Sequence, residues 1–123
     1  ELEARKAEFR SALQVYGAHM REMHGISYWI GRLEPALNAV MNSGDDVVIT
    51  DVRYQNEADW IRALGGIIIR RVRSDGVGLE GAQAEHSSET ELDGIKVDHT
   101  CNCNTIQRIQ DHARFWLKEW GSL

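Results

Sequence analysis

Apolar residues recur at helical spacing in four stretches of the chain, which predicts helices near 2–23, 28–42, 56–64 and 105–120. The second of these stretches contains Pro35, where we expect a kink or a new helix start. In the first stretch the spacing alternates between four and three, at Phe9, Leu13, Tyr16, Met20 and Met23. We expect this stripe to belong to a core or to contact a partner.

Runs of β-branched residues predict strands near 47–51, 67–73 and 97–101. The second run contains three consecutive isoleucines, which indicates a parallel strand buried on both faces. With the helix near 56–64 between them, the first two strands are expected to form a right-handed βαβ unit. The sequence therefore predicts an α/β fold in which a small parallel sheet is flanked by helices.

The ends of the helix near 56–64 carry specific signals. Asn56 is a candidate N-cap with Asp59 as its partner three residues later, and Gly65-Gly66 would end the helix. The length of 123 residues suits one domain, 1–123. Within that domain, residues 74–96 are rich in glycine and acidic residues, so we expect a lid-like loop there.

Composition narrows the function classes. The net charge of −5 argues against broad binding to nucleic acid, although arginines cluster between positions 53 and 73. The chain has no apolar run long enough to cross a membrane and no signal-peptide pattern. The only cysteines are Cys101 and Cys103, and residues two apart rarely form an unstrained disulfide, which favours a reduced, cytoplasmic protein. Because the sequence begins at Glu1 without methionine, we also expect a fragment or a processed chain.

The residues best suited to bind a ligand or take part in catalysis follow the first predicted strand. Asp51 ends this strand and Arg53 follows two residues later, at the sheet edge where ligands bind in open α/β folds. A carboxylate there can orient Mg²⁺ through water, and a guanidinium can grip phosphate oxygens. The alternative is a local ion pair that satisfies a loop. Arg73 has a comparable position at the end of the second predicted strand.

Two other groups of residues carry weaker signals. The run from His86 to Glu89 holds the residue types of a serine hydrolase, but adjacency in sequence does not make them converge in space, so we favour a lid turn capped by Ser88 with Glu91. The pattern His99-x-Cys101-x-Cys103 could hold a soft metal. A structural zinc site uses four ligands at turn-like spacings, so we predict no metal site.

A phosphate-binding P-loop is absent from the sequence. Its pattern, Gly-x-x-x-x-Gly-Lys-Ser/Thr, requires a lysine that directly follows a glycine. The lysines of this chain are Lys6, Lys96 and Lys118, and none of them follows a glycine. These 123 residues therefore lack the loop that cradles the phosphates of ATP in P-loop kinases.

The stretch from Thr50 to Ala58, followed by Ala63-Leu64-Gly65-Gly66, resembles the deoxynucleoside monophosphate kinases of bacteriophages. From Arg10 onward the chain is similar to this family in further motifs, in the same order: Arg10-x-x-Leu13-Gln14-x-x-Gly17, Tyr28-Trp29, Val72-Arg73, His86-x-Ser88-Glu89 and Asn102-x-Asn104-Thr105-Ile106. The chain departs from the family at Ala18, where threonine is usual, and at Ser74, where proline is usual.

The resemblance implies a P-loop kinase-like fold and transfer of the γ-phosphoryl group of ATP, with Mg²⁺, to a deoxynucleoside monophosphate. It implies that Asp51 lies near the metal or substrate, that Arg53 clamps phosphate, and that Arg73, His86 and Glu89 border the lid. Because this sequence lacks a P-loop, we expect it to be the C-terminal part of such a kinase. We expect this part to bind no ATP or Mg²⁺ by itself and to be inactive alone. The alternative is a non-catalytic kinase-like binding or dimerisation module.

The missing P-loop strand also bears on assembly. In kinases of this type it lies between the strands equivalent to 47–51 and 67–73, and its loss exposes their backbone hydrogen-bonding groups. We therefore expect either a homodimer or a fragment of a longer protein. The expected ligand is a nucleotide or another small molecule that contains phosphate.

Overall fold

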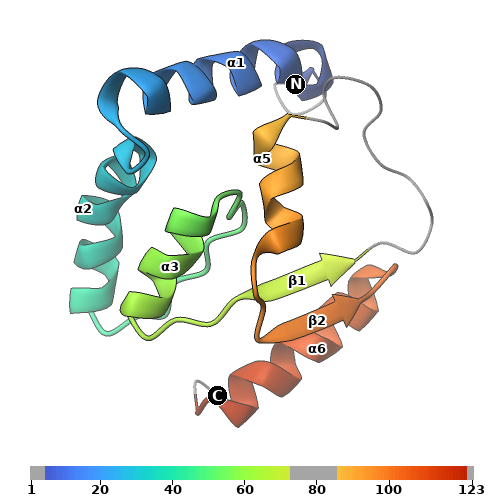
Figure 1. Ribbon diagram of the computed structural model, residues 1–123. Helices are drawn as coiled ribbons and strands as arrows, with labels where there is room; N and C mark the ends of the chain where they lie inside the picture. The colour runs from blue at the N-terminus through green and yellow to red at the C-terminus, as the bar shows by residue number, and fades with distance from the viewer. Residues whose placement is uncertain (1–4, 73–85, 122–123) are drawn as a thin grey trace. The chain divides into compact units, whose positions relative to one another are not determined.

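The computed structural model describes residues 5–72 and 86–121, apart from the side chains of Ser88 and Glu89. The longer helices are α1 (Lys6–His24), α2 (Tyr28–Asn42), α3 (Gln55–Ala63) and α6 (Ile106–Glu119). The remaining elements are the strands β1 (Ile69–Val72) and β2 (His99–Asn102), the short helix α5 (Ser87–Thr90) and the 3-10 helix η1 (Glu91–Gly94) (Figure 1). The α/β class and the four predicted helices are confirmed.

The chain divides into two compact units. One comprises Glu1–Trp60 with Leu79–Ile95, and the other comprises Ile61–Gly78 with Lys96–Leu123. The first unit therefore contains α1, α2, α5, η1 and most of α3, whereas the second contains both strands and α6. None of the described helices has the length and apolar character needed to cross a membrane.

The sheet of the second unit consists of β1 and β2, paired in parallel with Ile69 opposite His99 and Val72 opposite Asn102. Asp98 fixes the start of the pairing, because its carboxylate accepts from the Ile68 N–H at 2.7 Å and its own N–H donates to the Ile68 carbonyl at 2.8 Å. Two of the three predicted strands are thus confirmed.

The expectation that the isoleucine run is buried on both faces is wrong. Ile68 is buried, but Ile67 and Ile69 are 37% and 39% exposed. Because both strands of a two-stranded sheet are edge strands, neither has neighbours on both sides to exclude solvent.

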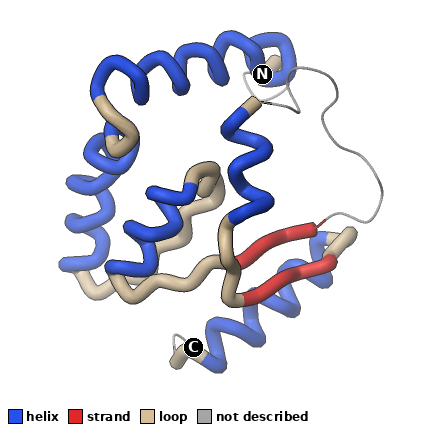
Figure 2. The backbone as a smooth tube through the Cα atoms, in the orientation of Figure 1, coloured by secondary structure: helices blue, strands red, loops and turns tan. Residues whose placement is uncertain are grey.

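The predicted strand near 47–51 is also absent. Residues 45–49 form an irregular segment, drawn as a tan loop in Figure 2, and Val48 is 81% exposed. A strand needs a neighbour that takes its backbone hydrogen bonds. Among the described residues, β1 pairs with β2 and nothing pairs with 47–51. The predicted βαβ unit around α3 is therefore not formed.

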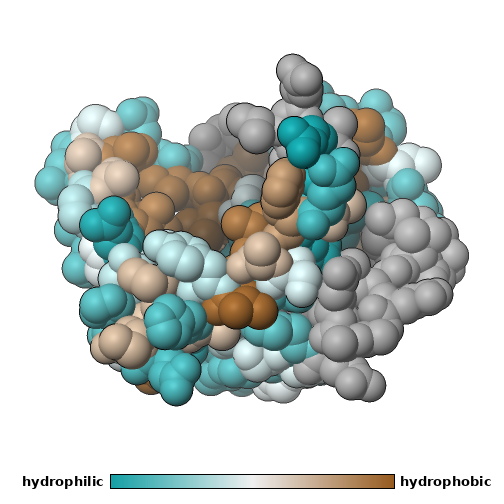
Figure 3. Space-filling view, turned by 90° about the horizontal axis from the view of Figure 1, so that it is seen from above, coloured by the Kyte–Doolittle hydropathy of each residue, from teal (hydrophilic) through white to brown (hydrophobic). Residues whose placement is uncertain are grey.

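The apolar stripe of α1 does not enter a core. Its members Phe9, Leu13, Tyr16 and Met23 are between 46% and 63% exposed, and α1 contains no buried residue. Figure 3 shows apolar residues, in brown, at the surface of the face it presents. Of the two expectations for this stripe, a core within the described part of the chain is excluded and contact with a partner stays a prediction.

Helices α1 and α2 meet through aromatic residues. The Trp29 indole N–H donates to the Gly17 carbonyl at 3.1 Å, and the Trp29 ring lies edge-on to Tyr16 with centroids 6.2 Å apart. Helix α2 buries Leu37 and continues through Pro35, so no new helix begins at the proline.

Helix α6 begins where the sequence predicts, because the Thr105 hydroxyl accepts from the Arg108 N–H at 3.3 Å as an N-cap. One face of α6 packs on the sheet, where Trp116 forms a buried cluster with Cys101 and Cys103. The predicted stripe of α6 is thus confirmed at Trp116, although Ile106 at its start is 76% exposed.

The two cysteines of this cluster are joined by a disulfide, which contradicts the expectation that they are reduced. Strand β2 ends at Asn102, so Cys103 lies outside the strand. The two Cα atoms are 5.5 Å apart, a separation that a disulfide can span. The sequence argument rested only on the separation of two residues along the chain, which does not by itself exclude a disulfide.

Candidate functional site

Asp51 and Arg53, the leading candidates from the sequence, lie together in the loop before α3. A guanidinium nitrogen of Arg53 is 3.7 Å from a carboxylate oxygen of Asp51, and the Thr50 hydroxyl donates to the other oxygen at 3.3 Å. The Asp51 side chain is 73% exposed. An exposed ion pair contributes only about 0–1 kcal/mol, so the contact with Asp51 by itself holds Arg53 only weakly.

Glu57 fixes the backbone of this loop. Its carboxylate accepts from the N–H groups of Arg53 at 2.8 Å and Tyr54 at 3.1 Å. The Tyr54 carbonyl in turn accepts from Glu57 N–H and Ala58 N–H, which places Tyr54 at the N-cap and Glu57 three residues after it. This is the backbone half of a capping box. Because the Arg53 N–H is part of it, the loop is ordered up to the candidate residue.

The predicted cap at Asn56 with Asp59 is therefore wrong. Helix α3 begins at Gln55, one residue earlier than expected, so Asn56 lies in its first turn. The Asp59 carboxylate accepts from the side-chain amide of Gln55 at 2.7 Å, whereas a capping-box partner accepts from the backbone N–H of the N-cap.

A second carboxylate reaches the start of α3 from η1. The Glu91 side chain accepts from the Gln55 N–H at 3.0 Å. The start of a helix is usually a ready site for phosphate, because its N–H groups are unpaired. Here the N–H groups of three successive residues, 53 to 55, are bonded to carboxylates. Because these three N–H groups already have carboxylate partners, an anion here would depend more on the Arg53 guanidinium than on them.

Arg21, in the last turn of α1, supports the loop from the other side. Its guanidinium lies 3.6 Å from the centroid of the buried Tyr54 ring and donates to the Asn56 side-chain oxygen from both terminal nitrogens, at 3.3 Å each. It also donates to the Ile26 carbonyl at 2.8 Å, which accepts from the Asn56 amide at 3.0 Å. This cluster of Arg21, Ile26, Tyr54 and Asn56 ties α1 to α3.

Sequence reasoning missed Arg21, Glu57 and Glu91 as supporting residues. Glu57 was within reach, because it lies three residues after the N-cap in the spacing of a capping box. Arg21 and Glu91 lie 35 and 36 positions from the α3 residues they contact, so no local spacing could connect them.

The remaining predicted residues are placed only in part. The His86 carbonyl accepts from the Thr90 N–H at 3.1 Å, which builds the short helical turn predicted near Ser88. Arg73 and the side chain of Glu89 lie outside the described residues. Of the predicted set, an ion pair joins Asp51 to Arg53, and the roles of all five residues stay predictions.

A separate group lies in the second unit around the disulfide. His99, considered as a metal ligand from the sequence, packs against Trp116 and Trp120 with ring centroids 5.5 and 5.7 Å apart. The imidazole that approaches the two sulfurs instead belongs to His112 of α6. The sequence pattern missed it, because His112 comes from a different element.

Comparison with known proteins gives one partial similarity. The chain is 48% identical over 50 residues to a protein named "Putative deoxynucleotide monophosphate kinase" from Acanthamoeba polyphaga mimivirus. The matched part covers 41% of this chain and 24% of that protein, so the chain spans about a quarter of the relative's length. No protein-family model and no solved structure matches the chain. The chain thus has a partial, kinase-like similarity to a protein named as a deoxynucleotide kinase.

Proposed function

We propose that these residues form the C-terminal, substrate-side part of a deoxynucleoside monophosphate kinase, which transfers the γ-phosphoryl group of ATP to a deoxynucleoside monophosphate. The observation that carries this proposal is the 48% identity over 50 residues to the mimivirus protein of that name. It agrees with the ordered motifs of the sequence and with the adjacency of Asp51 and Arg53.

In this proposal Arg53 is the phosphate clamp. Phosphoryl transfer depends mainly on positioning and charge neutralisation, and a guanidinium can bind two phosphate oxygens at once. The Arg53 N–H donates to the Glu57 carboxylate, and Arg21 packs on the neighbouring Tyr54 ring. These contacts would hold the Arg53 backbone in place while the substrate exchanges. Asp51 would act near Mg²⁺ or the substrate, and Arg73, His86 and Glu89 would border a lid.

The 123 residues would not transfer phosphate by themselves. In P-loop kinases, the backbone of the P-loop cradles the phosphates of ATP and its lysine reaches the transferred group. Since this sequence contains no such loop, ATP and Mg²⁺ belong to the complete active site and not to these residues alone.

A second candidate is a non-catalytic kinase-like module that dimerises. The exposed stripe of α1 favours it, because Phe9, Leu13 and Tyr16 are each 46–55% exposed at helical spacing. Light scattering separates a monomer of 14.0 kDa from a dimer. A dimer that Leu13→Glu dissociates would place the dimer interface on this stripe, and a wild-type monomer would exclude the dimerising form of the module.

Calorimetric titration tests the kinase proposal. The chain is titrated with each of the four deoxynucleoside monophosphates and with the corresponding deoxynucleosides. A kinase substrate site binds at least one monophosphate and binds its deoxynucleoside more weakly. If no monophosphate binds, or if the phosphate makes no difference, the proposal is wrong.

A further inference from the structure

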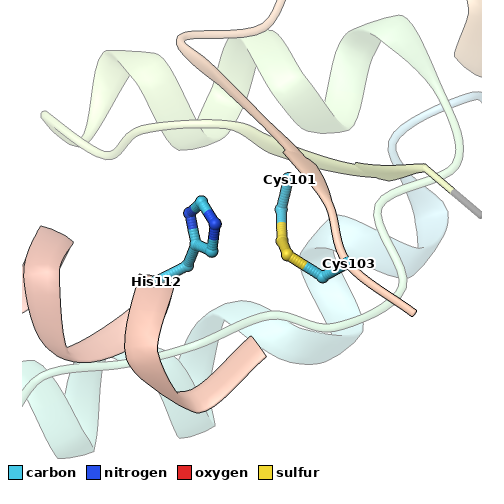
Figure 4. A group of neighbouring side chains, drawn as sticks. All are labelled: Cys101, Cys103 and His112. Carbon is cyan, nitrogen blue, oxygen red and sulfur yellow. A yellow bond between two sulfur atoms is a disulfide. The ribbon is translucent and has the colours of Figure 1, made fainter. Parts of the chain in front are cut away.

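Three side chains of metal-binding type converge between β2 and α6. Cys101 and Cys103 are 3% and 0% exposed, and His112 is exposed on α6. One ligand atom from each residue, a sulfur or an imidazole nitrogen, lies within 4.8 Å of the other two. In Figure 4 the His112 ring stands beside the disulfide, so the sulfurs and the imidazole face the same small space.

This arrangement suits a zinc ion once the disulfide is opened. Zn²⁺ binds thiolates at about 2.3 Å and imidazole at about 2.0 Å in tetrahedral geometry, which places neighbouring ligand atoms about 3.5–3.8 Å apart. The observed limit of 4.8 Å is close enough for side-chain rotation to reach that geometry. The prediction of no metal site considered ligands from the strand alone, and His112 supplies a third from the helix.

We propose that Cys101, Cys103 and His112 form a Zn²⁺ site that is available only when the two cysteines are reduced. A dithiol reductant delivers two electrons and two protons to the sulfur–sulfur bond, which breaks to give two thiols while the reductant becomes a disulfide. Zn²⁺ then displaces both thiol protons and binds two thiolates and the neutral imidazole. Water completes the fourth position.

The surroundings show which side of the group faces solvent and what binding would change. His112 borders an open hollow of about 380 Å³, which His99 and Asp111 also line, so an ion would approach the group from the imidazole side. The disulfide links two residues of one segment, whereas the zinc would link the end of β2 to α6. Oxidation would therefore remove the zinc-mediated link between β2 and α6 and leave only the disulfide between Cys101 and Cys103.

Cobalt titration of the whole chain tests this site. The chain is reduced with a dithiol, freed of reductant under nitrogen, and titrated with Co²⁺, whose thiolate charge-transfer and tetrahedral d–d bands report the ligands. One Co²⁺ per chain is expected, followed by displacement with Zn²⁺ and release of two protons per ion from the metal-free dithiol. The oxidised chain should give no thiolate bands.

Two variants assign the third ligand. His112→Ala should weaken Co²⁺ binding at least tenfold, because it removes an exposed ligand without opening the buried cluster. His19→Ala, an exposed histidine on α1, is the matched control and should bind as the wild type does. If the reduced wild type lacks thiolate bands, or if His112→Ala binds Co²⁺ as tightly as His19→Ala, the site does not exist.

Discussion

The guanidinium of Arg21 lies 3.6 Å from the centroid of the Tyr54 ring, and Tyr54 is only 8% exposed. This contact joins the end of α1 to the residue directly after Arg53. Because 47–51 is not a strand, the sheet of the described residues does not position Asp51 and Arg53. The Arg21 contact and the Glu57 cap take that role, which makes the candidate site depend on two side chains outside it.

Replacing Arg21 with alanine should destabilise the chain by about 2 kcal/mol. The variant loses a cation–π contact with a buried ring and charged hydrogen bonds to Asn56 and Ile26, although such terms are not additive. Urea unfolding measures the change. Arg32→Ala, an exposed arginine on α2, is the control and should stay within about 0.5 kcal/mol of the wild type. Equal losses in the two variants would contradict this role of Arg21.

Glu57→Ala should cost about 1 kcal/mol, since it leaves the N–H groups of Arg53 and Tyr54 without their carboxylate. Amide hydrogen exchange should accelerate at these two positions. Asp59→Ala serves as the comparison, because the sequence favoured Asp59 as the cap partner whereas the structure bonds it to a side chain. Faster exchange at Arg53 and Tyr54 in Asp59→Ala than in Glu57→Ala would reverse the assignment.

Two glycine substitutions should have opposite effects. A Cβ at Gly66 would lie 2.6 Å from the Ile61 Cγ2 and 3.0 Å from the Ile61 carbonyl oxygen, so Gly66→Ala should destabilise by about 1–3 kcal/mol. At Gly31, inside α2, a Cβ meets nothing within 4 Å. Gly31→Ala should therefore stabilise by about 0.5–1 kcal/mol. Thermal unfolding of both variants checks the signs, and a stabilised Gly66→Ala would refute the close approach.

The chain alone should transfer no phosphate from ATP to any deoxynucleoside monophosphate in the presence of Mg²⁺. The physical reason is that nothing in these 123 residues provides the P-loop backbone and lysine that hold the transferred group. Radiolabelled ATP and chromatographic separation of the products give the measurement. Diphosphate product that appears with the wild type and disappears with Arg53→Ala would overturn this prediction.

The helices could be predicted because their signals are local. Side chains three and four residues apart define a helical face by themselves, and the predicted start near 105 and the predicted end at Gly65-Gly66 were both correct. The strand at 47–51 failed for the opposite reason. Val47, Val48 and Ile49 have strand propensity, but propensity makes a strand only where a neighbour accepts the hydrogen bonds.

In the candidate site, too, only the contacts between residues close in sequence could be predicted. Asp51 and Arg53 are two residues apart, so the sequence could place them together, and the structure does. The contacts from Arg21 and Glu91, and the approach of His112 to the two cysteines, join elements distant along the chain. Such contacts follow from tertiary packing, which a spacing pattern does not encode.

The most direct test of the central claim is the affinity of the chain for deoxynucleoside monophosphates with and without Arg53. The account predicts that the monophosphate which binds best loses about 10- to 100-fold in affinity in Arg53→Ala, the equivalent of about 1.5–3 kcal/mol for charged hydrogen bonds to phosphate. Arg71→Ala, an exposed arginine on β1, should bind as the wild type does. Unchanged binding in Arg53→Ala, or an equal loss in both variants, would contradict the assignment of Arg53 as the phosphate clamp.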